Sequence, residues 1–214
     1  MADHGMIFVD GSRLLASIKE IWRTRPEFQG RRLKIDMLSE HLMSMTGRYI
    51  GQVVRVAYYF KRDDKQVEKL IIVPDVTRPG AKNHWQIIEC AQSLPTIPDE
   101  QLQRLDEKWR TFFPRGEKGL DMRLACDALS AVVAGRIMNE VFLVNDEDFI
   151  PLFEAIQRLG GNIYLIALDS VGSKRLAELS DHVFSLAGSL GEVFESKKVE
   201  PVSTEVESER VSSS

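Results

Sequence analysis

The sequence predicts an α/β protein, a three-layer sandwich in which helices cover both faces of a central parallel sheet. Short apolar runs of strand type alternate along the chain with segments of helical spacing. Strands that alternate with helices pair in parallel through right-handed crossovers. The first of these runs, Met6–Val9, is also unbroken by polar residues, as is typical of a strand buried on both faces.

The N-terminal unit is a strand followed by a helix. Met6–Val9 is short, apolar and unbroken, which predicts a central strand. After the turn at Gly11, apolar residues recur at helical spacing over Leu14–Trp22, and Pro26 ends this helix.

The next elements are a helix, a strand and a loop. Helical spacing predicts a helix over Leu33–Met45 that ends at Gly47, followed by a strand over Val53–Phe60. Residues 71–84 contain two prolines and predict a mobile loop, and Trp85–Leu94 predicts a helix. The stretch LQRLDEKWRTFFPRGE further on is open between helix and strand.

The C-terminal half repeats the alternation more clearly. Apolar periodicity and the Gly-Gly stop at residues 160–161 define its elements. We expect a helix over Leu120–Ile137, a strand over Glu140–Val144, a helix over Phe149–Leu159, a strand over residues 162–168 and a helix with a turn over Leu176–Leu186.

The 214 residues suit one domain with one core. The segment ESKKVEPVSTEVESERVSSS at the C-terminus has almost no large apolar residues, so it lacks the means to pack. We expect one folded domain over residues 1–194 and a disordered, acidic and Ser-rich tail over residues 195–214.

Charge and cysteine usage indicate the compartment. A formal net charge of −4 argues against blanket binding to nucleic acid or anionic membranes, although a focused basic groove remains compatible with it. Cys90 and Cys126 lie in helix-like stretches far apart in sequence and predict two buried thiols in a reducing compartment. No leader pattern and no membrane-length apolar window occurs, so we expect a cytoplasmic protein without a membrane partner.

Carboxylates stand where the predicted strands end. Asp10 follows the first strand, and Asp146 and Asp148 follow the strand over Glu140–Val144. Ligands gather outside the carboxyl ends of parallel strands, so these side chains are expected to converge. Asp121 opens a helix and can point at the same crevice, while Asp127 lies deeper on about the same side and would support the site.

Such a cluster calls for a cation. Grouped carboxylates repel one another, and one takes up a proton unless a cation neutralises the set. Mg²⁺ or Mn²⁺ accepts carboxylate oxygen, retains waters and can activate one of them against a phosphate. The simpler interpretation is that each aspartate only caps a helix or a turn, and for any one of them alone we favour it.

Three segments carry a resemblance to a known family. IFVDG, EKGLDMRLACDAL and VFLVNDEDFIPLFEAIQRLGGNIYLIAL resemble the NYN domain, a branch of the PIN-like ribonuclease superfamily. The resemblance covers the N-terminal strand and about residues 118–169. It implies a parallel-sheet domain whose acids hold Mg²⁺ or Mn²⁺ for RNA hydrolysis, and superfamily members often pair, which makes a homodimer an expected assembly.

The resemblance also assigns roles by position. It implies a catalytic, metal-holding acidic cluster, a supporting helix aspartate and a basic residue before the glycine. These are Asp10, Asp121, Asp146 and Asp148 for the cluster, Asp127 for the support and Lys118 for the basic residue.

Two positions depart from the family pattern. Arg13 stands where asparagine is usual, and Val144-Asn145 stands where serine-glycine is frequent. A guanidinium keeps its charge, so an inward Arg13 would take the place of a metal and silence catalysis. An outward Arg13 would instead grip a substrate phosphate. The sequence leaves both open.

Basic residues surround the predicted acidic centre. Arg13, Lys118 and Arg123 are the expected substrate-binding residues, since phosphates need local Lys and Arg. The four histidines show no zinc-ligand spacing, and no dinucleotide or nucleoside-triphosphate loop motif occurs. The sequence therefore predicts a metal-dependent endoribonuclease acting on RNA, with an inactive RNA-binding or protein-assembly module as the alternative.

Overall fold

The computed structural model describes residues 4–74, 84–90, 119–168 and 172–196. The first half of the fold comprises β1 His4–Asp10, α1 Gly11–Thr24, a 3₁₀ turn Pro26–Phe28, β2 Leu33–Lys34, α2 Ile35–Ile50, β3 Gln52–Lys61, α3 Lys65–Leu70, β4 Ile71–Ile72 and β5 Trp85–Cys90. The second half comprises α6 Leu120–Val133, β6 Asn139–Leu143, a 3₁₀ turn Glu147–Phe149, α7 Ile150–Arg158, β7 Asn162–Ala167, α8 Lys174–Leu179, β8 His182–Ser185 and α9 Leu190–Val193.

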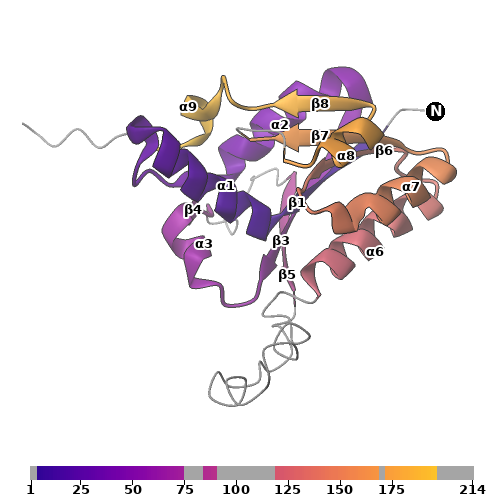
Figure 1. Cartoon of the computed structure of the whole chain (residues 1–214), viewed down its shortest axis with the longest axis horizontal. Coiled ribbons are helices and arrows are strands. Elements are labelled where there is room, and N and C mark those ends of the chain that lie inside the picture. The colour runs from indigo at the N-terminus through magenta and orange to yellow at the C-terminus, as the bar shows by residue number, and fades with distance from the viewer. Residues whose placement is uncertain (1–3, 75–83, 91–118, 169–171, 197–214) are drawn as a thin grey trace, which may run out of the picture.

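The fold is a three-layer α/β sandwich around a six-stranded parallel sheet (Figure 1). The strand order is β5-β3-β1-β6-β7-β8, and every neighbouring pair is parallel. The predicted fold class is therefore confirmed. A separate two-stranded parallel ladder joins β2 to β4.

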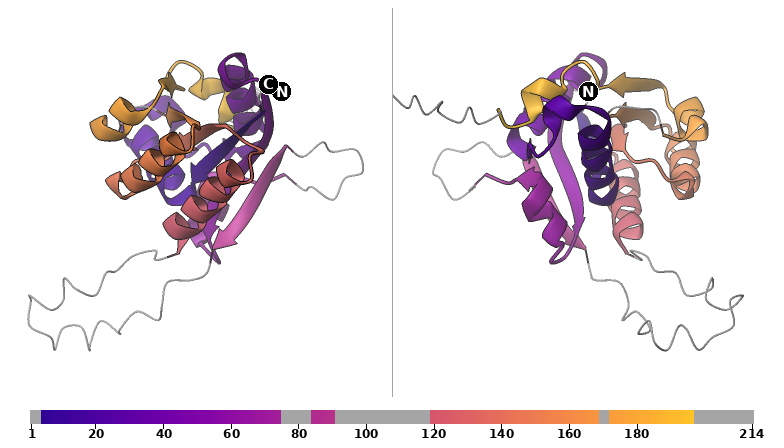
Figure 2. Two further views of the ribbon diagram at one scale, coloured as in Figure 1. Left: turned by 90° about the vertical axis from the view of Figure 1, so that its right-hand side faces the viewer. Right: turned by 60° about the vertical axis from the view of Figure 1, so that its left-hand side comes forward.

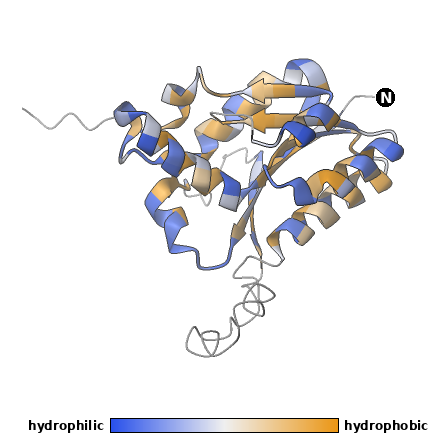
Figure 3. Ribbon diagram, viewed as in Figure 1, coloured by the Kyte–Doolittle hydropathy of each residue, from blue (hydrophilic) through white to orange (hydrophobic). Residues whose placement is uncertain are grey.

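Each strand of the centre buries both of its faces. In β1, Ile7 and Val9 face one apolar cluster with α1, α2 and α9, whereas Phe8 faces a second cluster with α6, α7 and α8. Figure 2 shows these two groups of helices on opposite sides of the sheet. Figure 3 shows apolar colour along much of the central strands, in keeping with burial on both faces.

The chain reverses its direction of travel across the sheet beside β1. From β1 the chain proceeds to β3 and β5 on one side, and later returns to β6, β7 and β8 on the other. The neighbours β1 and β6 are therefore the topological switch point. In open parallel sheets the crevice outside the carboxyl ends of such strands is where ligands bind.

The expected helix over Trp85–Leu94 is wrong. Residues Trp85–Cys90 form the edge strand β5, which pairs with β3 from Val56↔Trp85 to Lys61↔Cys90. A short run with two adjacent isoleucines fits either element, and the free edge of β3 offers backbone partners that a helix would leave unused. Residues 91–118 lie outside the described part of the chain.

Three helices also have boundaries that differ from expectation. Leu33–Lys34 is a strand, and α2 runs through Gly47 to Ile50, where Gly51 with φ 73° ends it. Helix α6 stops at Val133. Residues Leu176–Leu186, expected to form a helix with a turn, are divided between α8 and the edge strand β8, because Leu165 to Ala167 of β7 supply a ladder for Val183 to Ser185.

The expectation of two buried thiols is half right. Both cysteines are free, and Cys90 is buried on β5, but Cys126 is exposed on α6. In the described residues, none of the helices combines the length and apolar character that crossing a bilayer requires. The tail beyond residue 196 lies outside the described residues.

Candidate functional site

A pocket of about 540 Å³ opens at the switch point between β1 and β6. It lies where the chain leaves the carboxyl ends of these two strands. Its lining comes from the start of α1 and from the segment after β6. The lining residues are Asp10, Ser12, Arg13, Ala16, Asn145, Asp146 and Glu147. The pocket thus brings together Asp10, Arg13 and Asp146 among the predicted site residues.

Asp10 is held firmly by the helix that it caps. Its side chain is only 7% exposed, and its Oδ1 accepts hydrogen bonds from the backbone N–H groups of Ser12 at 2.8 Å and Arg13 at 3.2 Å. Capping satisfies two donors of the first turn of α1. The capping role considered above is therefore present, and it fixes the carboxylate at the pocket wall.

Gly11 makes this turn possible. A Cβ at Gly11 would lie 2.3 Å from the carbonyl oxygen of Tyr59 and 2.2 Å from the ring of Phe60. Helix α1 can therefore begin directly against β3 only with glycine at this position. The FVDGS sequence ends its strand on aspartate because Asp10 both caps α1 and lines the pocket.

Asp146 enters the pocket from the loop after β6. Its Oδ1 accepts the backbone N–H of Asp148 at 3.0 Å, which caps the turn Glu147–Phe149. The Asp146 side chain is exposed, in contrast to that of Asp10. Two carboxylates of different burial thus face one pocket.

Arg13 lines the same pocket from the first turn of α1. Its side chain is half-buried. Burial lowers the pKa of the guanidinium, and the negative charge of Asp10 opposes that shift. The group stays charged at any physiological pH. A positive charge therefore sits beside Asp10 in the pocket.

Asp121 and Asp148 do not line this pocket. Asp121 lies in the first turn of α6, a helix whose C-terminal end leads within five residues to the start of β6. Helix α6 has 14 residues and is therefore about 20 Å long. Because its C-terminal end lies near the start of β6, its N-terminal end lies toward the carboxyl edge of the sheet. Asp148 is exposed in the turn after β6. Lys118 lies outside the described residues.

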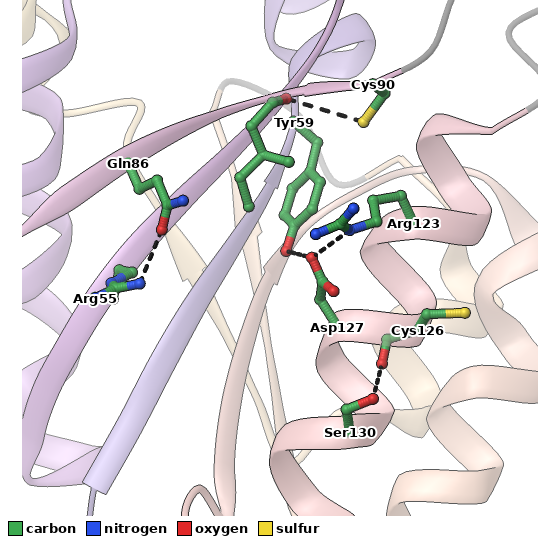
Figure 4. Close-up of polar contacts among 9 residues, drawn as sticks. Arg55, Tyr59, Gln86, Cys90, Arg123, Cys126, Asp127 and Ser130 are labelled. Carbon is green, nitrogen blue, oxygen red and sulfur yellow. Dashed lines mark hydrogen bonds and ion pairs between the residues drawn. The ribbon is translucent and has the colours of Figure 1, made fainter.

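Asp127 joins a polar network between β3 and α6 (Figure 4). The Tyr59 hydroxyl donates to Asp127 Oδ2 at 3.1 Å, and Arg123 Nε donates to the same oxygen at 2.9 Å. Burial raises the pKa of Tyr59, and the charge of Asp127 raises it further, so the phenol stays protonated. Tyr59 is the register partner of Asp10, so this network lies on the strand next to the one that carries Asp10.

Arg123 therefore forms an ion pair with Asp127 and does not line the pocket. The Arg123 side chain is 58% exposed and donates to Asp127 through Nε, so its other N–H donors remain available to further partners. It lies one helical turn from the N-terminal end of α6. This placement is compatible with a phosphate contact at the rim of the site.

Four lining residues, Ser12, Ala16, Asn145 and Glu147, were not predicted as site residues from the sequence. Ser12 lies two residues after Asp10, and Asn145 and Glu147 flank Asp146. The Glu147 carboxylate accepts the Ser173 hydroxyl at 2.9 Å and lies 3.7 Å from Arg175, which directs it toward α8. Position directly after a buried strand is the signal that would have found Ser12 and Asn145.

The number of carboxylates in the pocket limits which kind of metal site it can form. In the ranges 4–74, 84–90, 119–168 and 172–196, no three His, Cys, Asp or Glu side chains form a group able to hold an ion. A protein cage for a resident ion is therefore not present there. Two carboxylates do fit Mg²⁺ or Mn²⁺ that keeps waters and takes its remaining ligands from a bound phosphate.

Comparisons with known proteins agree with this architecture. No curated protein matches the chain. A solved structure of a protein of unknown function from Vibrio parahaemolyticus shares the fold, with a TM-score of 0.51 and 16% identity over 86% of this chain and 93% of that chain. The family model of the NYN domain matches residues 5–187. The chain therefore belongs to the NYN domain family, within the PIN-like nuclease superfamily.

Proposed function

We propose that the chain is a metal-dependent endoribonuclease that hydrolyses RNA phosphodiesters in the pocket at the switch point. The observation that carries the proposal is that Asp10 and Asp146, from the ends of neighbouring strands, line one pocket together with Arg13. Membership of the NYN family supports a nuclease-like, RNA-related role. Carboxylates beside a guanidinium are the groups that phosphoryl chemistry uses.

Each side chain has a role in this proposal. Asp10 and Asp146 would hold Mg²⁺ or Mn²⁺ together with an RNA phosphate. A divalent ion bound there supplies a water of lowered pKa and offsets charge on the phosphate. Arg13 binds a phosphate oxygen through its paired N–H donors and orients the RNA strand. In-line attack by water would leave a 5′-phosphate and a 3′-hydroxyl.

The other predicted residues act from the edge of the pocket. We assign Asp121 and Asp148 to supporting the negative field that attracts the ion, since both lie toward the carboxyl edge of the sheet. Asp127 positions Tyr59 beside Asp10. Arg123 and Lys118 would contact the RNA backbone.

Cleavage of single-stranded RNA in the presence of Mn²⁺ tests the proposal. The wild-type chain should cut, and Asp146→Asn should lower the rate by about a hundredfold or more because an amide lacks the charge that the ion requires. The melting temperature should hardly change, since Asn still caps the following turn. Glu178→Gln is the matched control, because Glu178 is an exposed carboxylate on α8. A wild-type protein that binds RNA and never cuts it contradicts the proposal.

The second candidate is a non-catalytic RNA-binding module that keeps the fold. One observation favours it: Arg13 lies in the pocket beside Asp10, where its charge can neutralise the carboxylates in place of an ion. In that case the pocket binds an RNA phosphate and performs no hydrolysis. The two candidates differ in the role of Arg13: it either binds the RNA phosphate or neutralises the aspartates in place of a metal ion.

Replacement of Arg13 by asparagine separates the two candidates. If Arg13 holds substrate, Arg13→Asn should weaken RNA binding about tenfold, the loss of one good phosphate contact, and lower cleavage with it. If Arg13 takes the place of an ion, the same change should create Mn²⁺ binding, measured by calorimetry, that the wild type lacks. Arg158→Gln, at an exposed position at the end of α7, serves as the charge control.

A further inference from the structure

A second pocket, of about 380 Å³, lies between α2 and the edge strand β8. We call it the α2–β8 groove, defined by His41, Arg48, Tyr49, His182 and Phe184. None of these residues lines the pocket at the switch point. The groove is thus a separate surface feature that the proposed hydrolysis does not use.

Aromatic rings form one wall of the groove. The Tyr49 and His182 rings stack with centroids 4.8 Å apart and an angle of 16° between their planes. Phe184 meets both rings edge-on, at 5.0 Å from Tyr49 and 4.7 Å from His182. Tyr49 is nevertheless 57% exposed. A flat ring, fixed from one side and open to solvent, is the surface on which an unpaired nucleobase stacks.

Positive charge accompanies these rings. Arg48 lies beside Tyr49 in the last turn of α2 and lines the groove. His41 also lines it, but its Nδ1 lies 3.0 Å from the Glu192 carboxylate and its Nε2 2.8 Å from the Ser189 hydroxyl, so Arg48 is the cation on which the inference rests. Within the described residues the lining of the groove contains no Asp or Glu, although the chain is acidic as a whole, at −4. A charge of this sign suits a phosphate next to a stacked base.

We propose that the α2–β8 groove binds a single-stranded segment of RNA, with one base stacked on Tyr49 and the adjoining phosphate on Arg48. The inference rests on the proposed function in taking RNA as the ligand, and it adds a binding site away from the pocket of hydrolysis. Strand addition by a protein partner is the less suitable occupant, because β8 has only four residues and short edge strands are poor templates.

The experiment measures binding of a labelled oligouridine by fluorescence anisotropy, with EDTA present so that no RNA is cut. Tyr49→Leu keeps an apolar side chain and removes the ring, so affinity should fall about tenfold, the value of one stacked base. Tyr49→Phe keeps the ring and should bind as the wild type does. Val133→Ala, at an apolar position of comparable exposure on α6, is the matched control.

A strand without bases separates stacking from charge. The Tyr49→Leu variant and the wild type should bind an abasic oligonucleotide of the same length equally well. Arg48→Gln should weaken binding of both the oligouridine and the abasic oligonucleotide. Photocrosslinking of 5-iodouridine RNA to the wild type should label Tyr49 or His182, and it decides the question if Tyr49→Leu does not fold.

The outcomes distinguish this inference from the proposed function. If the wild type binds and cuts RNA while Tyr49→Leu retains full affinity and no crosslink forms at the groove, the inference is overturned and the ribonuclease proposal stands. A homodimer that Tyr49→Leu dissociates, with RNA affinity unchanged, also overturns it. A wild-type chain that binds no RNA would overturn both the inference and the ribonuclease proposal.

Discussion

Glu140 shows how one buried carboxyl group can make stability depend on pH. It is fully buried on β6, and neither carboxylate oxygen has a hydrogen-bond partner in the described residues. Burial raises the pKa of Glu140 to about 9. The charged form would cost too much without a partner, so the group is protonated in the folded protein at neutral pH.

The sign of the pH dependence follows from this shift. The pKa of Glu140 in the folded state lies above the unfolded value of 4.5. The stability that comes from keeping Glu140 protonated is therefore fully present below pH 4.5 and is lost as the pH rises toward 9. Glu140→Gln removes the titration. The wild type should lose up to about 1.4 kcal/mol of unfolding free energy per pH unit in this window, relative to the variant.

Urea unfolding of both proteins at pH 5 and pH 8 checks this prediction. Glu140→Gln should gain stability relative to the wild type as the pH rises. Glu178→Gln, at an exposed position on α8, should follow the wild-type slope. Identical slopes for Glu140→Gln and the wild type would show that Glu140 does not titrate in this window.

At the residue scale, the aspartates at the strand ends were predictable and their neighbours were not. Asp10 and Asp146 could be expected to converge because the carboxyl ends of adjacent parallel strands share one edge. Whether Arg13 faces the pocket depends on how the first turn of α1 packs against β3 at Gly11. No local sequence pattern encodes that packing. The burial of Glu140 likewise depends on packing from distant elements.

At the element scale, the junction of β1 and α1 controls the site. Gly11 is buried where α1 begins, and any Cβ there would meet the Tyr59 carbonyl oxygen and the Phe60 ring. By contrast, Gly47 lies inside α2, and a Cβ added there would point into open space. The two glycines therefore have opposite roles.

Alanine at each glycine gives a matched prediction. Gly11→Ala should lower the unfolding free energy by several kcal/mol, on the order of an overpacked core, and displace Asp10. Gly47→Ala should raise it by about 0.5–1 kcal/mol, since alanine favours the helix interior. Thermal unfolding of the two variants measures both effects. Equal and small shifts would mean that α1 can move away from β3.

The strands that the sequence predicted correctly are those inside the sheet. Strands β1, β3, β6 and β7 have apolar runs that fit a strand covered on both faces. The edge strand β5 was expected to be helical, and β8 was expected to belong to a helix with a turn. Their short runs acquire strand character only from the ladder of β3 or β7. Tertiary pairing overrode the local pattern there.

At the scale of the whole molecule, the described fold extends slightly past the expected domain end. The Glu195 backbone N–H donates to the Arg32 carbonyl at 2.9 Å, and the Glu195 carboxylate accepts the Arg32 N–H at 3.1 Å. Phe194 packs on Phe28 with ring centroids 5.1 Å apart. We propose that the NYN domain includes Glu195 and that the tail begins just after it.

The central claim is that Asp10 and Asp146 together receive a divalent ion at the switch point of the sheet. Anomalous scattering from a crystal grown with Mn²⁺ and a non-cleavable RNA dinucleotide tests it most directly. The account predicts one or two manganese peaks within bonding distance of both carboxylates, about 2.0–2.4 Å from oxygen, with Arg13 on the phosphate. The Arg13 guanidinium between the two aspartates, with no manganese there, would contradict it.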